Sequence, residues 1–457
     1  MVEQAVEQAG QSSEITRLLA ENATEIAFDA LPADVVFVTK HCLLDWLGVT
    51  MAGALEPLTQ KLADYVAAEG GAAQATLIGI GRKVSAGQAA LVNGSAGHAL
   101  DYDDVLRLLN GHPTAPVMPA VLALAERRGA NGRAVIEAFA AGVETESRVG
   151  AIMGEGHYAH GWHATATVGH FGAAAGAARL LGLDAETTAV ALGIAGTQAA
   201  GLKSMFGTMC KPLHAGKAAQ NGLFAAEMAS RGFTANAAVI ECLQGFGDTQ
   251  TDTFAPEKGL DGLGERYLLP TMRFKYHAAC YGTHGPIDAA GVCRDNPGFD
   301  LEAIDRIEIR VTSRCLRMCN IPVPSTGLEA KFSLRFAVGL ALAGVDTGRL
   351  DTFGDAIIGR SDVMALCARA AVIGDDTLER NESIVVVHLR DGTVLQGHAD
   401  LSDPVEDLDL TWRRLQTKFR GLAEPIVGAA KTEQMLTIVD DLENVESLST
   451  LLGASAP

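Results

Sequence analysis

Apolar residues recur at helical spacing over most of the first 267 positions, and Gly and Pro are the main interruptions. Ile15, Leu18 and Leu19 share one face of a helix with 3.6 residues per turn, and this helix is predicted to end before Pro32. A second helix is expected after that break, so residues 12–69 are predicted to form a two-helix opening. The apolar face of the second helix consists of Leu43, Leu44, Trp46 and Leu47.

Small residues occupy the packing faces of the helices that follow. Between positions 84 and 100 they recur mostly at steps of three and four, which predicts a helix. Two further helices are predicted over 115–127 and 133–148. Because Ala and Gly let helix backbones approach closely, we expect a densely packed all-helical domain over residues 1–267.

The pattern changes after residue 268. Residues 304–311 largely alternate apolar and charged side chains, which predicts a half-buried strand. Residues 383–397 repeat this alternation, with Asp391-Gly392 as a hairpin turn between Val-rich arms. Helical spacing returns at 333–343 and 362–372. A smaller α+β domain is therefore expected over residues 268–403.

The C-terminal tail, residues 406–452, returns to amphipathic helical spacing and is expected to pack against the first domain. The final residues 453–457 are expected to fray. The predicted fold is mainly α, with an all-helical part over 1–267 and 404–457 and an α+β part over 268–403. The apolar face of the tail helix consists of Trp412, Leu415, Phe419 and Leu422.

Length, charge and cysteine content narrow the class of protein. A chain of 457 residues exceeds the usual size of a single core, so two domains are expected. A formal net charge of -19 argues against nucleic acid as a partner. No long uncharged apolar run predicts a membrane span, and acids at Glu3 and Glu7 argue against a signal peptide. Eight cysteines without a CxxC pair suit reduced thiols, and the expected location is the cytoplasm.

The stretch from His157 to Lys217 is unusual for so acidic a chain. Its only acids are Asp184 and Glu186, whereas it retains several His and Lys residues. A chain that clears acids from one stretch and keeps cationic donors there is expected to bind an anion at that place.

Parts of the sequence are also compatible with three alternatives to an anion-binding site. The acidic run 101–104 (Asp-Tyr-Asp-Asp) resembles a diphosphate or magnesium motif, but aromatic residues make up only 5% of the chain, too few for a terpene cavity. His157, His160 and His163 have a spacing that suits a metal site, although Gly156 and Gly161 disfavour a regular helix there. Structural roles, with carboxylates capping helices and histidines satisfied in the core, are a further alternative.

The favoured interpretation combines carboxylates, imidazoles and an ammonium group from distant segments. Such a set is suited to binding a small polycarboxylate and to moving a proton beside one of its carboxylates. Histidine suits the base because its unperturbed pKa lies near neutrality, and the chemistry demands no redox cofactor. The residues in this set are Asp101, Asp104, His112, His163, Lys211, His214 and His284.

These motifs resemble the MmgE/PrpD family over nearly the full chain. That family includes 2-methylcitrate dehydratase, cis-aconitate decarboxylase and iminodisuccinate epimerase. The motifs that carry the resemblance are Leu44-Asp45-Trp46-Leu47-Gly48, Asn93-Gly94, His98-Ala99-Leu100-Asp101-Tyr102-Asp103-Asp104, Gly111-His112-Pro113, Gly161-Trp162-His163, Lys211-Pro212-Leu213-His214, Thr283-His284 and Ala330-Lys331-Phe332-Ser333.

The resemblance implies a fold and an activity. It implies a large helical domain built from both chain ends, a smaller α+β lid domain, a homodimer, and a site between the two domains. The expected enzyme is a cofactor-independent lyase or isomerase that acts on a small di- or tricarboxylate, with no metal. A helical binding or assembly protein that retains the scaffold is the non-enzymatic alternative.

The resemblance also implies roles for individual residues. His163 or His112 is expected to be the base, and Asp101 its orienter or the acid. Lys211 and His284 are expected to anchor carboxylates, with His214 and Lys331 as further substrate-binding residues.

The sequence departs from the family pattern at one place, and two of its segments are more similar to one branch of the family. Val105 stands where the decarboxylases carry Thr, and the segment from there to His112 is one residue longer, which disfavours cis-aconitate decarboxylase. The segments 156–163 and 206–209 look closer to the epimerase branch, so epimerisation competes with dehydration as the expected reaction.

Overall fold

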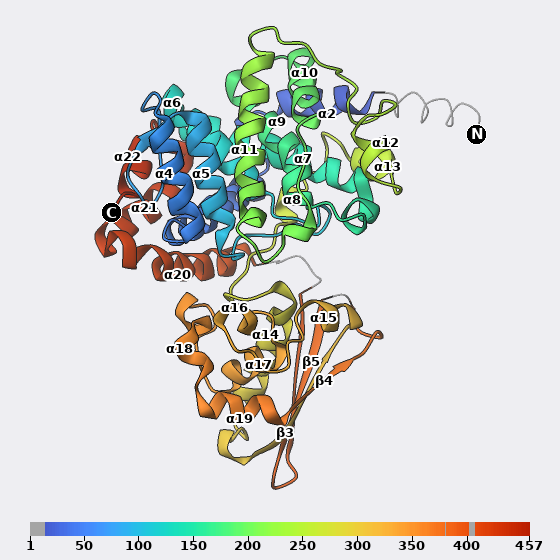
Figure 1. The fold of residues 1–457 in the computed structure, drawn as a ribbon, viewed down its shortest axis with the longest axis vertical. Coiled ribbons are helices and arrows are strands. Elements are labelled where there is room, and N and C mark those ends of the chain that lie inside the picture. The colour runs from blue at the N-terminus through green and yellow to red at the C-terminus, as the bar shows by residue number, and fades with distance from the viewer. Residues whose placement is uncertain (1–13, 380, 402–406) are drawn as a thin grey trace, which may run out of the picture. The chain divides into compact units, whose positions relative to one another are not determined.

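A computed structural model describes residues 14–379, 381–401 and 407–457 of the chain. The chain divides into two compact units, and each is described by itself (Figure 1). Unit 1 comprises Met1–Phe274 and Asp407–Pro457, and unit 2 comprises Lys275–Glu406. The fold is mainly helical, as predicted. The sequence-based domain boundaries at 267 and 403 stay predictions, and the expectations that involve Glu3, Glu7, the helix start at Ser12 and the tail start at Glu406 lie outside the described residues.

From residue 14, where the described part of unit 1 begins, three α-helices precede Gly70, one more than predicted. They are α2 (Ile15–Glu25), α3 (Ala33–Gly53) and α4 (Pro57–Glu69). The additional break follows Gly53, and Pro57 at the start of α4 can begin a helix because its missing N–H is not needed there. By length and composition alone α3 could cross a membrane, but 89% of its apolar window is buried inside the protein, as in a core helix of a globular domain.

The contact between α5 (Ala86–Ala99) and α11 (Cys210–Ala229) depends on glycine. A Cβ on Gly216 would lie 2.1 Å from the carbonyl oxygen of Leu91, and a Cβ on Gly94 would lie 2.9 Å from the Cα of Gly216. The two backbones therefore touch where their helices meet, as the small-residue pattern predicted. This contact fixes the end of α5 relative to the beginning of α11.

The predicted helices over 115–127 and 133–148 are confirmed as α6 (Thr114–Arg128) and α7 (Gly132–Ala159). α7 continues past its predicted end and bends at Gly154, whose φ of 65° lies in the left-handed region. The other α-helices and strands described between Glu69 and Phe274 are β1 (Ala75–Thr76), β2 (Lys83–Val84), α8 (Ala164–Thr167), α9 (Gly169–Leu181), α10 (Ala185–Gly196), α12 (Phe246–Gln250) and α13 (Pro256–Leu260).

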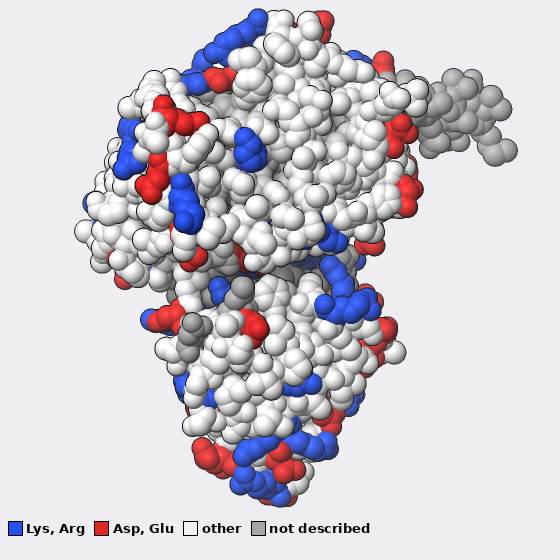
Figure 2. All heavy atoms as spheres, in the orientation of Figure 1, with Lys and Arg blue, Asp and Glu red and all other residues white. Residues whose placement is uncertain are grey.

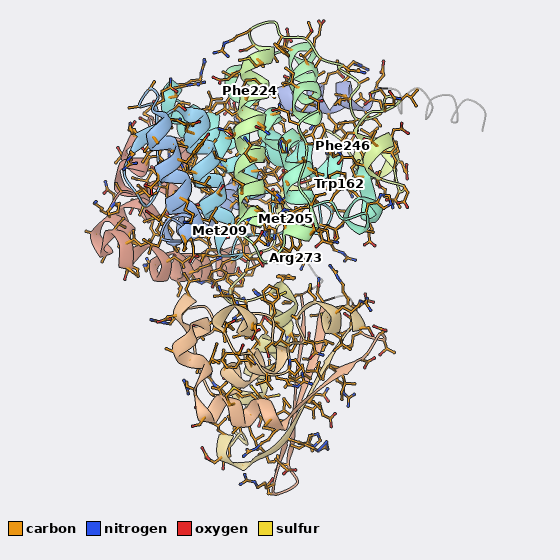
Figure 3. All side chains as sticks on the ribbon, viewed as in Figure 1. Trp162, Met205, Met209, Phe224, Phe246 and Arg273 are labelled. Carbon is orange, nitrogen blue, oxygen red and sulfur yellow. The ribbon has the colours of Figure 1, made fainter. Side chains whose placement is uncertain are left out.

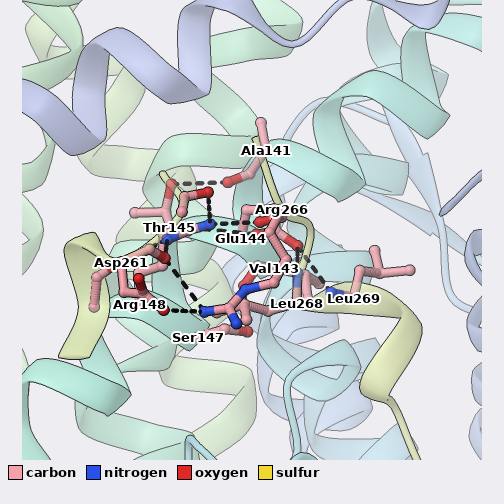
Figure 4. Close-up of polar contacts among 12 residues, drawn as sticks. Ala141, Val143, Glu144, Thr145, Ser147, Arg148, Asp261, Arg266, Leu268 and Leu269 are labelled. Atoms are coloured by element: carbon pink, nitrogen blue, oxygen red, sulfur yellow. Dashed lines mark hydrogen bonds and ion pairs between the residues drawn. The ribbon is translucent and has the colours of Figure 1, made fainter. Parts of the chain in front are cut away.

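Glu144 and Arg148, two buried residues of α7, bind backbone groups of the segment 259–269 (Figure 4). Glu144 accepts backbone hydrogen bonds from Leu268 at 2.6 Å and Leu269 at 2.8 Å. Arg148 donates to the carbonyl oxygens of Gly259 at 2.8 Å and Arg266 at 2.6 Å. Burial raises the pKa of Glu144 to about 7. Because both side chains form hydrogen bonds with backbone groups, we assign them a structural role.

The C-terminal helices return to unit 1, as predicted. They are α20 (Leu408–Val427), α21 (Ala429–Asp440) and α22 (Ser449–Ala454). The predicted apolar face of α20 is buried, and Phe419 lies against Gly48 of α3. The prediction of a frayed end is wrong, because Ser455 is fully buried and its carbonyl oxygen accepts a 3.0 Å hydrogen bond from Gly79.

Unit 2 contains a four-stranded sheet in the order β4-β3-β5-β6. The predicted strand over 304–311 is confirmed as β3 (Ile304–Val311), and the predicted hairpin is confirmed as β5 (Glu382–Leu389) and β6 (Val394–Asp400). The helix predicted over 362–372 ends earlier than expected: α19 (Ser361–Arg369) is followed at once by β4 (Ala370–Gly374), which pairs with β3 in parallel.

Helices cover the apolar face of this sheet (Figure 1). A Cβ on Gly397 of β6 would lie 1.9 Å from the carbonyl oxygen of Ala289, so α14 (His284–Arg294) touches the sheet backbone there. On the face that Figure 2 shows, Lys and Arg are interspersed with acids and form no continuous basic surface. The other helices of unit 2 are α15 (Ser313–Met318), α16 (Gly327–Ala330), α17 (Leu334–Leu342) and α18 (Asp355–Ile358).

Candidate active site

The site in unit 1 begins where α5 ends. A Ser85 capping box with Gln88 starts this helix, and His98 lies in its last turn. Three residues later Asp101 adopts a φ of 52°, a left-handed conformation that Asp and Asn tolerate better than most residues. The chain therefore turns sharply at Asp101, and the acidic run 101–104 leaves the helix instead of extending it.

The C-terminal helix α20 fixes this turn from the other side. Lys418 donates to the carbonyl oxygen of Tyr102 at 2.7 Å and to the carboxylate of Asp45 at 2.6 Å. Its ammonium nitrogen also lies 3.8 Å from the centre of the Tyr102 ring. Lys418 and Asp45 are nearly completely buried, so their charges are matched inside the protein. Both ends of the chain thus contribute to positioning the acidic run.

Asp103 lies between two imidazoles. His98 donates from Nδ1 to Oδ2 of Asp103 at 2.8 Å, and Nδ1 of His112 lies 3.2 Å from the same oxygen. Asp103 is fully buried; burial alone would raise its pKa, but the two histidines outweigh it and hold the pKa well below the usual range. Burial lowers the pKa of His98 to about 4. We therefore assign an ionised Asp103 that accepts from a neutral His98.

Asp104, the next residue, has the opposite character. It accepts hydrogen bonds from the backbone and hydroxyl of Thr114, the first residue of α6. Burial, reinforced by nearby Asp45, raises the pKa of Asp104 well above its usual range. Asp104 thus holds the start of α6, which is the structural alternative considered for this residue.

Lys211 and Asp101 bring opposite charges together from segments 110 residues apart. The Lys211 ammonium donates to Oδ1 of Asp101 at 2.7 Å, and Nε2 of His112 lies 3.6 Å from that oxygen. Lys211 occupies the first turn of α11, where the helix dipole is positive. The side chain of Asp101 is about one third exposed, whereas those of Lys211 and His112 are more buried. Lys211 is thus a mostly buried ammonium group beside a carboxylate that is partly open to solvent.

His163 and His214 form the opposite wall. Their Nδ1 atoms lie 3.2 Å apart, and the His163 ring stacks 5.6 Å from that of His98. Phe206 packs edge-on against His163 at 5.0 Å. Burial, followed by the neighbouring imidazoles and Lys211, lowers the pKa of His163 well below its usual range. Burial and Lys211 also lower the pKa of His214. Both imidazoles are therefore neutral at pH 7 and able to accept a proton.

The segments that carry these residues meet at one end of α11. His163 donates from its backbone N–H to Gly201 at 2.9 Å, and Trp162 and Leu202 form a β-bridge. Figure 3 labels Trp162, Met205 and Met209 in this region, near the beginning of α11. The ends of the stretch singled out in the sequence are thus joined in space.

The alternative metal site formed by His157, His160 and His163 is not present. Nε2 of His157 contacts Thr167 Oγ1 at 2.7 Å and its Nδ1 contacts the carbonyl oxygen of Gln250 at 3.0 Å, which uses both ring nitrogens. His160 pairs instead with Asp252 at 3.3 Å. Only His163 of the three belongs to the site.

A different group of residues has the composition of a metal site. His98, Asp101, Asp103 and His112 each offer a ligand atom, and these atoms lie within 4.8 Å of one another. His98 Nε2, His112 Nδ1 and Asp103 Oδ1 are buried without a hydrogen-bond partner in the described part of the chain, although His112 Nδ1 lies 3.2 Å from Asp103 Oδ2. Asp101 Oδ1 already accepts from Lys211, and Asp103 Oδ2 is paired with His98 Nδ1.

Two predicted site residues, His284 and Lys331, belong to unit 2. His284 is buried at the start of α14, and its Nε2 contacts the carbonyl oxygen of Ala279 at 3.2 Å. Lys331 directly follows α16 and is half-buried, and its carbonyl oxygen accepts a 3.0 Å hydrogen bond from Cys280. This bond joins their two segments within unit 2. Their roles as substrate ligands stay predictions.

The structure adds two residues to those expected from the sequence. His98 and Asp103 belong to the family motif without a predicted role, but Asp103 contacts the expected His112, and His98 stacks on the expected His163. The signal in the sequence was their spacing of five residues across the end of a helix. That spacing does not reveal the pairing, because it depends on the turn at Asp101.

Comparison with known proteins supports the resemblance noted in the sequence. The MmgE/PrpD N-terminal domain matches residues 17–258, and the MmgE/PrpD C-terminal domain matches residues 277–444. A cis-aconitate decarboxylase-like protein of Aspergillus oryzae is 27% identical over 96% of both chains. The cis-aconitate decarboxylase of Mus musculus is 28% identical over 90% of this chain and 87% of its own length. That of Homo sapiens is 27% identical, with 93% and 91% covered. The chain therefore belongs to the MmgE/PrpD family.

Proposed function

We propose that this protein is a cofactor-independent lyase or isomerase that moves a proton at a carbon beside a carboxylate of a small di- or tricarboxylate. The observation that carries the proposal is the convergence of Asp101, His112, His163 and Lys211 in one corner of unit 1. Neutral imidazoles are suited to take the proton, and a fixed ammonium group opposes the negative charge that develops on the carboxylate.

His163 is the favoured base. Its lowered pKa keeps it unprotonated at pH 7, and its contact with His214 gives the accepted proton a second imidazole to share. His112 is the alternative, because its Nδ1 lies against ionised Asp103 and its Nε2 lies nearest to Asp101. An imidazole that donates from Nδ1 to a carboxylate presents an unprotonated Nε2 to substrate. Asp101 then orients this group or returns the proton.

Lys211 is proposed to anchor a substrate carboxylate. In the absence of substrate it is paired with Asp101, so binding exchanges one carboxylate partner for another. The family resemblance extends this role to His284 and Lys331, and His214 supplies a further donor beside Lys211. A substrate with two or three carboxylates offers partners for such a set of donors.

cis-Aconitate is the first substrate to test, because the curated relatives compared here are named for its decarboxylation. Epimerisation and dehydration are the competing reactions, for a specific reason. The family resemblance places Val105 where the decarboxylases carry Thr. Val105 exchanges two backbone hydrogen bonds with Arg273 at 2.8 and 3.0 Å. The segment after it closes through a Leu106–Gly111 bridge. This segment lies beside Asp101 and His112, so a change in its length or sequence relative to the decarboxylases affects which substrate fits the site.

Proton NMR in D₂O tests the proposal directly. The protein is incubated separately with citrate, 2-methylcitrate, cis-aconitate and iminodisuccinate, and both product formation and loss of the proton beside the carboxylate are followed. We expect one acid to exchange deuterium at carbon. A His163→Asn variant should lose that exchange while remaining folded by circular dichroism. A chain that binds these acids without exchange or turnover is a binding protein, and the proposal is then wrong.

The assembly is proposed from the family resemblance, and the location from the cysteine pattern of the sequence. We propose a homodimer that acts in the cytoplasm. Light scattering coupled to size-exclusion chromatography should give twice the 47.7 kDa chain mass, and a monomer at micromolar concentration would contradict the dimer.

A further inference from the structure

Three of the eight cysteines meet in unit 2. Cys315 lies within α15, Cys319 follows the end of this helix, and Cys280 precedes the short helix η4 (Tyr281–Thr283). The thiol of Cys319 donates a 3.5 Å hydrogen bond to the carbonyl oxygen of Cys315, and all three cysteines belong to the buried core of unit 2. Cys319 is fully buried, and the other two are less than 10% exposed. We call Cys280, Cys315 and Cys319 the thiol cluster.

The Cys315 thiol is more acidic than the Cys319 thiol. The neighbouring Cys319 thiol, Thr312 and the charge of Arg314 together hold the pKa of Cys315 below its usual range, against the opposing effect of burial. The Thr312 hydroxyl donates to Cys315 Sγ at 3.8 Å. The neighbouring thiols of Cys280 and Cys315 raise the pKa of Cys319. In contrast, burial raises the pKa of Cys293 in the same unit to about 11.

The cluster supports the turn that leads to His284. An added Cβ on Gly282 would lie 2.9 Å from Cys319 Sγ, 3.6 Å from Cys315 Sγ and 2.6 Å from the terminal carbon of Met318. Gly282 therefore packs directly on the two thiols, and it precedes His284 by two residues. A sulfur that gains an oxygen atom or moves toward another sulfur changes the surface on which this turn rests.

We propose that Cys315 and Cys319 form a site of reversible oxidation by hydrogen peroxide. The Cys315 thiolate attacks one peroxide oxygen, the O–O bond breaks, and water leaves after protonation, so Cys315 becomes a sulfenic acid. Cys319 then attacks this sulfur; an S–S bond forms, the S–O bond breaks, and the hydroxyl group leaves as water with the thiol proton. Two thiols are oxidised and one peroxide is reduced to two waters.

The backbone geometry is compatible with this bond. Residues four apart on a helix have Cβ atoms about 5–6 Å apart, whereas a disulfide needs about 3.5–4.5 Å. Closing that gap requires a local shift of about 1–2 Å. Because α15 ends at Met318 and Cys319 has left the helical conformation, the shift can be taken up at the helix end.

Mass spectrometry on the full chain tests the site without any substrate. The protein is treated with hydrogen peroxide, its free thiols are alkylated, and peptides are mapped before and after reduction with dithiothreitol. We expect a Cys315–Cys319 link that dithiothreitol reverses. Cys319→Ser should abolish the link and leave Cys315 as a sulfenic acid that dimedone traps, whereas Cys293→Ser should leave the link unchanged. Unmodified Cys315 under conditions that oxidise exposed Cys210, or a link from Cys280 instead, overturns the proposal.

Coupling to activity rests on the proposed function of His284. With the acid identified by NMR, peroxide should lower turnover at least fivefold, and dithiothreitol should restore it. The Cys319→Ser and Cys315→Ser variants should resist this reversible loss, while Cys293→Ser should not. Because the link is detected independently of activity, a failed substrate screen does not affect the first test. A chain that forms the link with unchanged turnover overturns the coupling.

Discussion

The ammonium nitrogen of Lys211 lies 2.7 Å from the carboxylate of Asp101, although 110 residues separate them in the chain. Two local features create this pair. Asp101 leaves α5 in a left-handed conformation, and Lys211 stands in the first turn of α11. The close contact of α5 and α11 at Gly94 and Gly216 then sets their separation. A charged pair near solvent contributes little to folding stability, so we assign the Lys211–Asp101 pair a functional role in the site.

Replacing Lys211 with Ala should impair catalysis more than folding. Removing the ammonium group leaves Asp101 without this cation and removes the proposed carboxylate anchor. We expect kcat/KM to fall by about 2 to 4 kcal/mol of transition-state stabilisation, measured by steady-state kinetics on the acid identified by NMR. Lys217→Ala, an exposed lysine on the same helix, is the control and should stay near wild type. Unchanged kinetics for Lys211→Ala would remove the anchor role.

The neighbours Asp103 and Asp104 offer a matched comparison. Both are fully buried, but two imidazoles hold the pKa of Asp103 well below its usual range, whereas burial raises the pKa of Asp104 well above it. Asp103→Asn removes a charge that orients His98 and His112, and we expect kcat to fall about 10- to 1000-fold with a shifted pH profile. Asp104→Asn keeps an oxygen acceptor for Thr114 and should keep kcat within about threefold. Equal kcat losses in the two variants would show that Asp103 is only structural.

Much of the fold could be predicted because small residues at helical spacing identify the faces on which the helices pack. α5 and α6 lie within two residues of their predicted ends, and β3 matches its prediction. The secondary-structure predictions are wrong where one sequence pattern is compatible with both a helix and a strand. Residues 370–372 continue an apolar helical pattern, but pairing with β3 makes them a strand, and such short apolar runs are ambiguous without their neighbours.

The site could be predicted in part. Within unit 1, residue type and family resemblance identified Asp101, His112, His163 and Lys211, and the structure brings these together. The pairing of Asp103 with His98 and His112 could not be read from spacing, because it depends on the turn at Asp101 and on the segment 105–112. The three-histidine alternative failed for a similar reason, since hydrogen bonds to Thr167 and Gln250 already occupy His157.

Acid should destabilise the protein through its buried histidines. Burial lowers the pKa of His170 from 6.5 to about 4, so the unfolded chain binds more protons than the folded one between these values. The contribution is present above pH 6.5 and is lost as pH falls toward 4, at a cost of about 2 kcal/mol between pH 7 and pH 5. His98 and His157 act in the same direction, while Glu144, Asp104 and Glu146, whose pKa values burial raises, oppose them.

Urea unfolding at pH 7 and pH 5 measures this effect. The midpoint should be lower at pH 5, and His170→Gln should reduce the difference because its side chain does not titrate. His398→Gln, which removes a half-exposed histidine of unit 2, is the control and should leave the difference nearly unchanged. An identical stability difference between the two pH values in His170→Gln and in the wild type would contradict the burial argument.

Removal of metal ions should leave the activity intact, even though four side chains could coordinate one. In the group of His98, Asp101, Asp103 and His112, Asp101 already pairs with Lys211 and Asp103 with the two histidines. A cation would have to enter beside the Lys211 ammonium and break these contacts, which costs electrostatic energy.

Activity on the acid identified by NMR, assayed before and after dialysis against EDTA, decides the point when bound metals are quantified in parallel. We expect kcat to stay within about twofold at a metal content far below one ion per chain. Added Zn²⁺ should inhibit if it binds at all, because it would displace Lys211 from Asp101 and immobilise His112. A loss of kcat on chelation that Zn²⁺ or Mg²⁺ reverses would instead make the four residues a catalytic metal site, and Asp103→Asn should then lower the metal content as well as kcat.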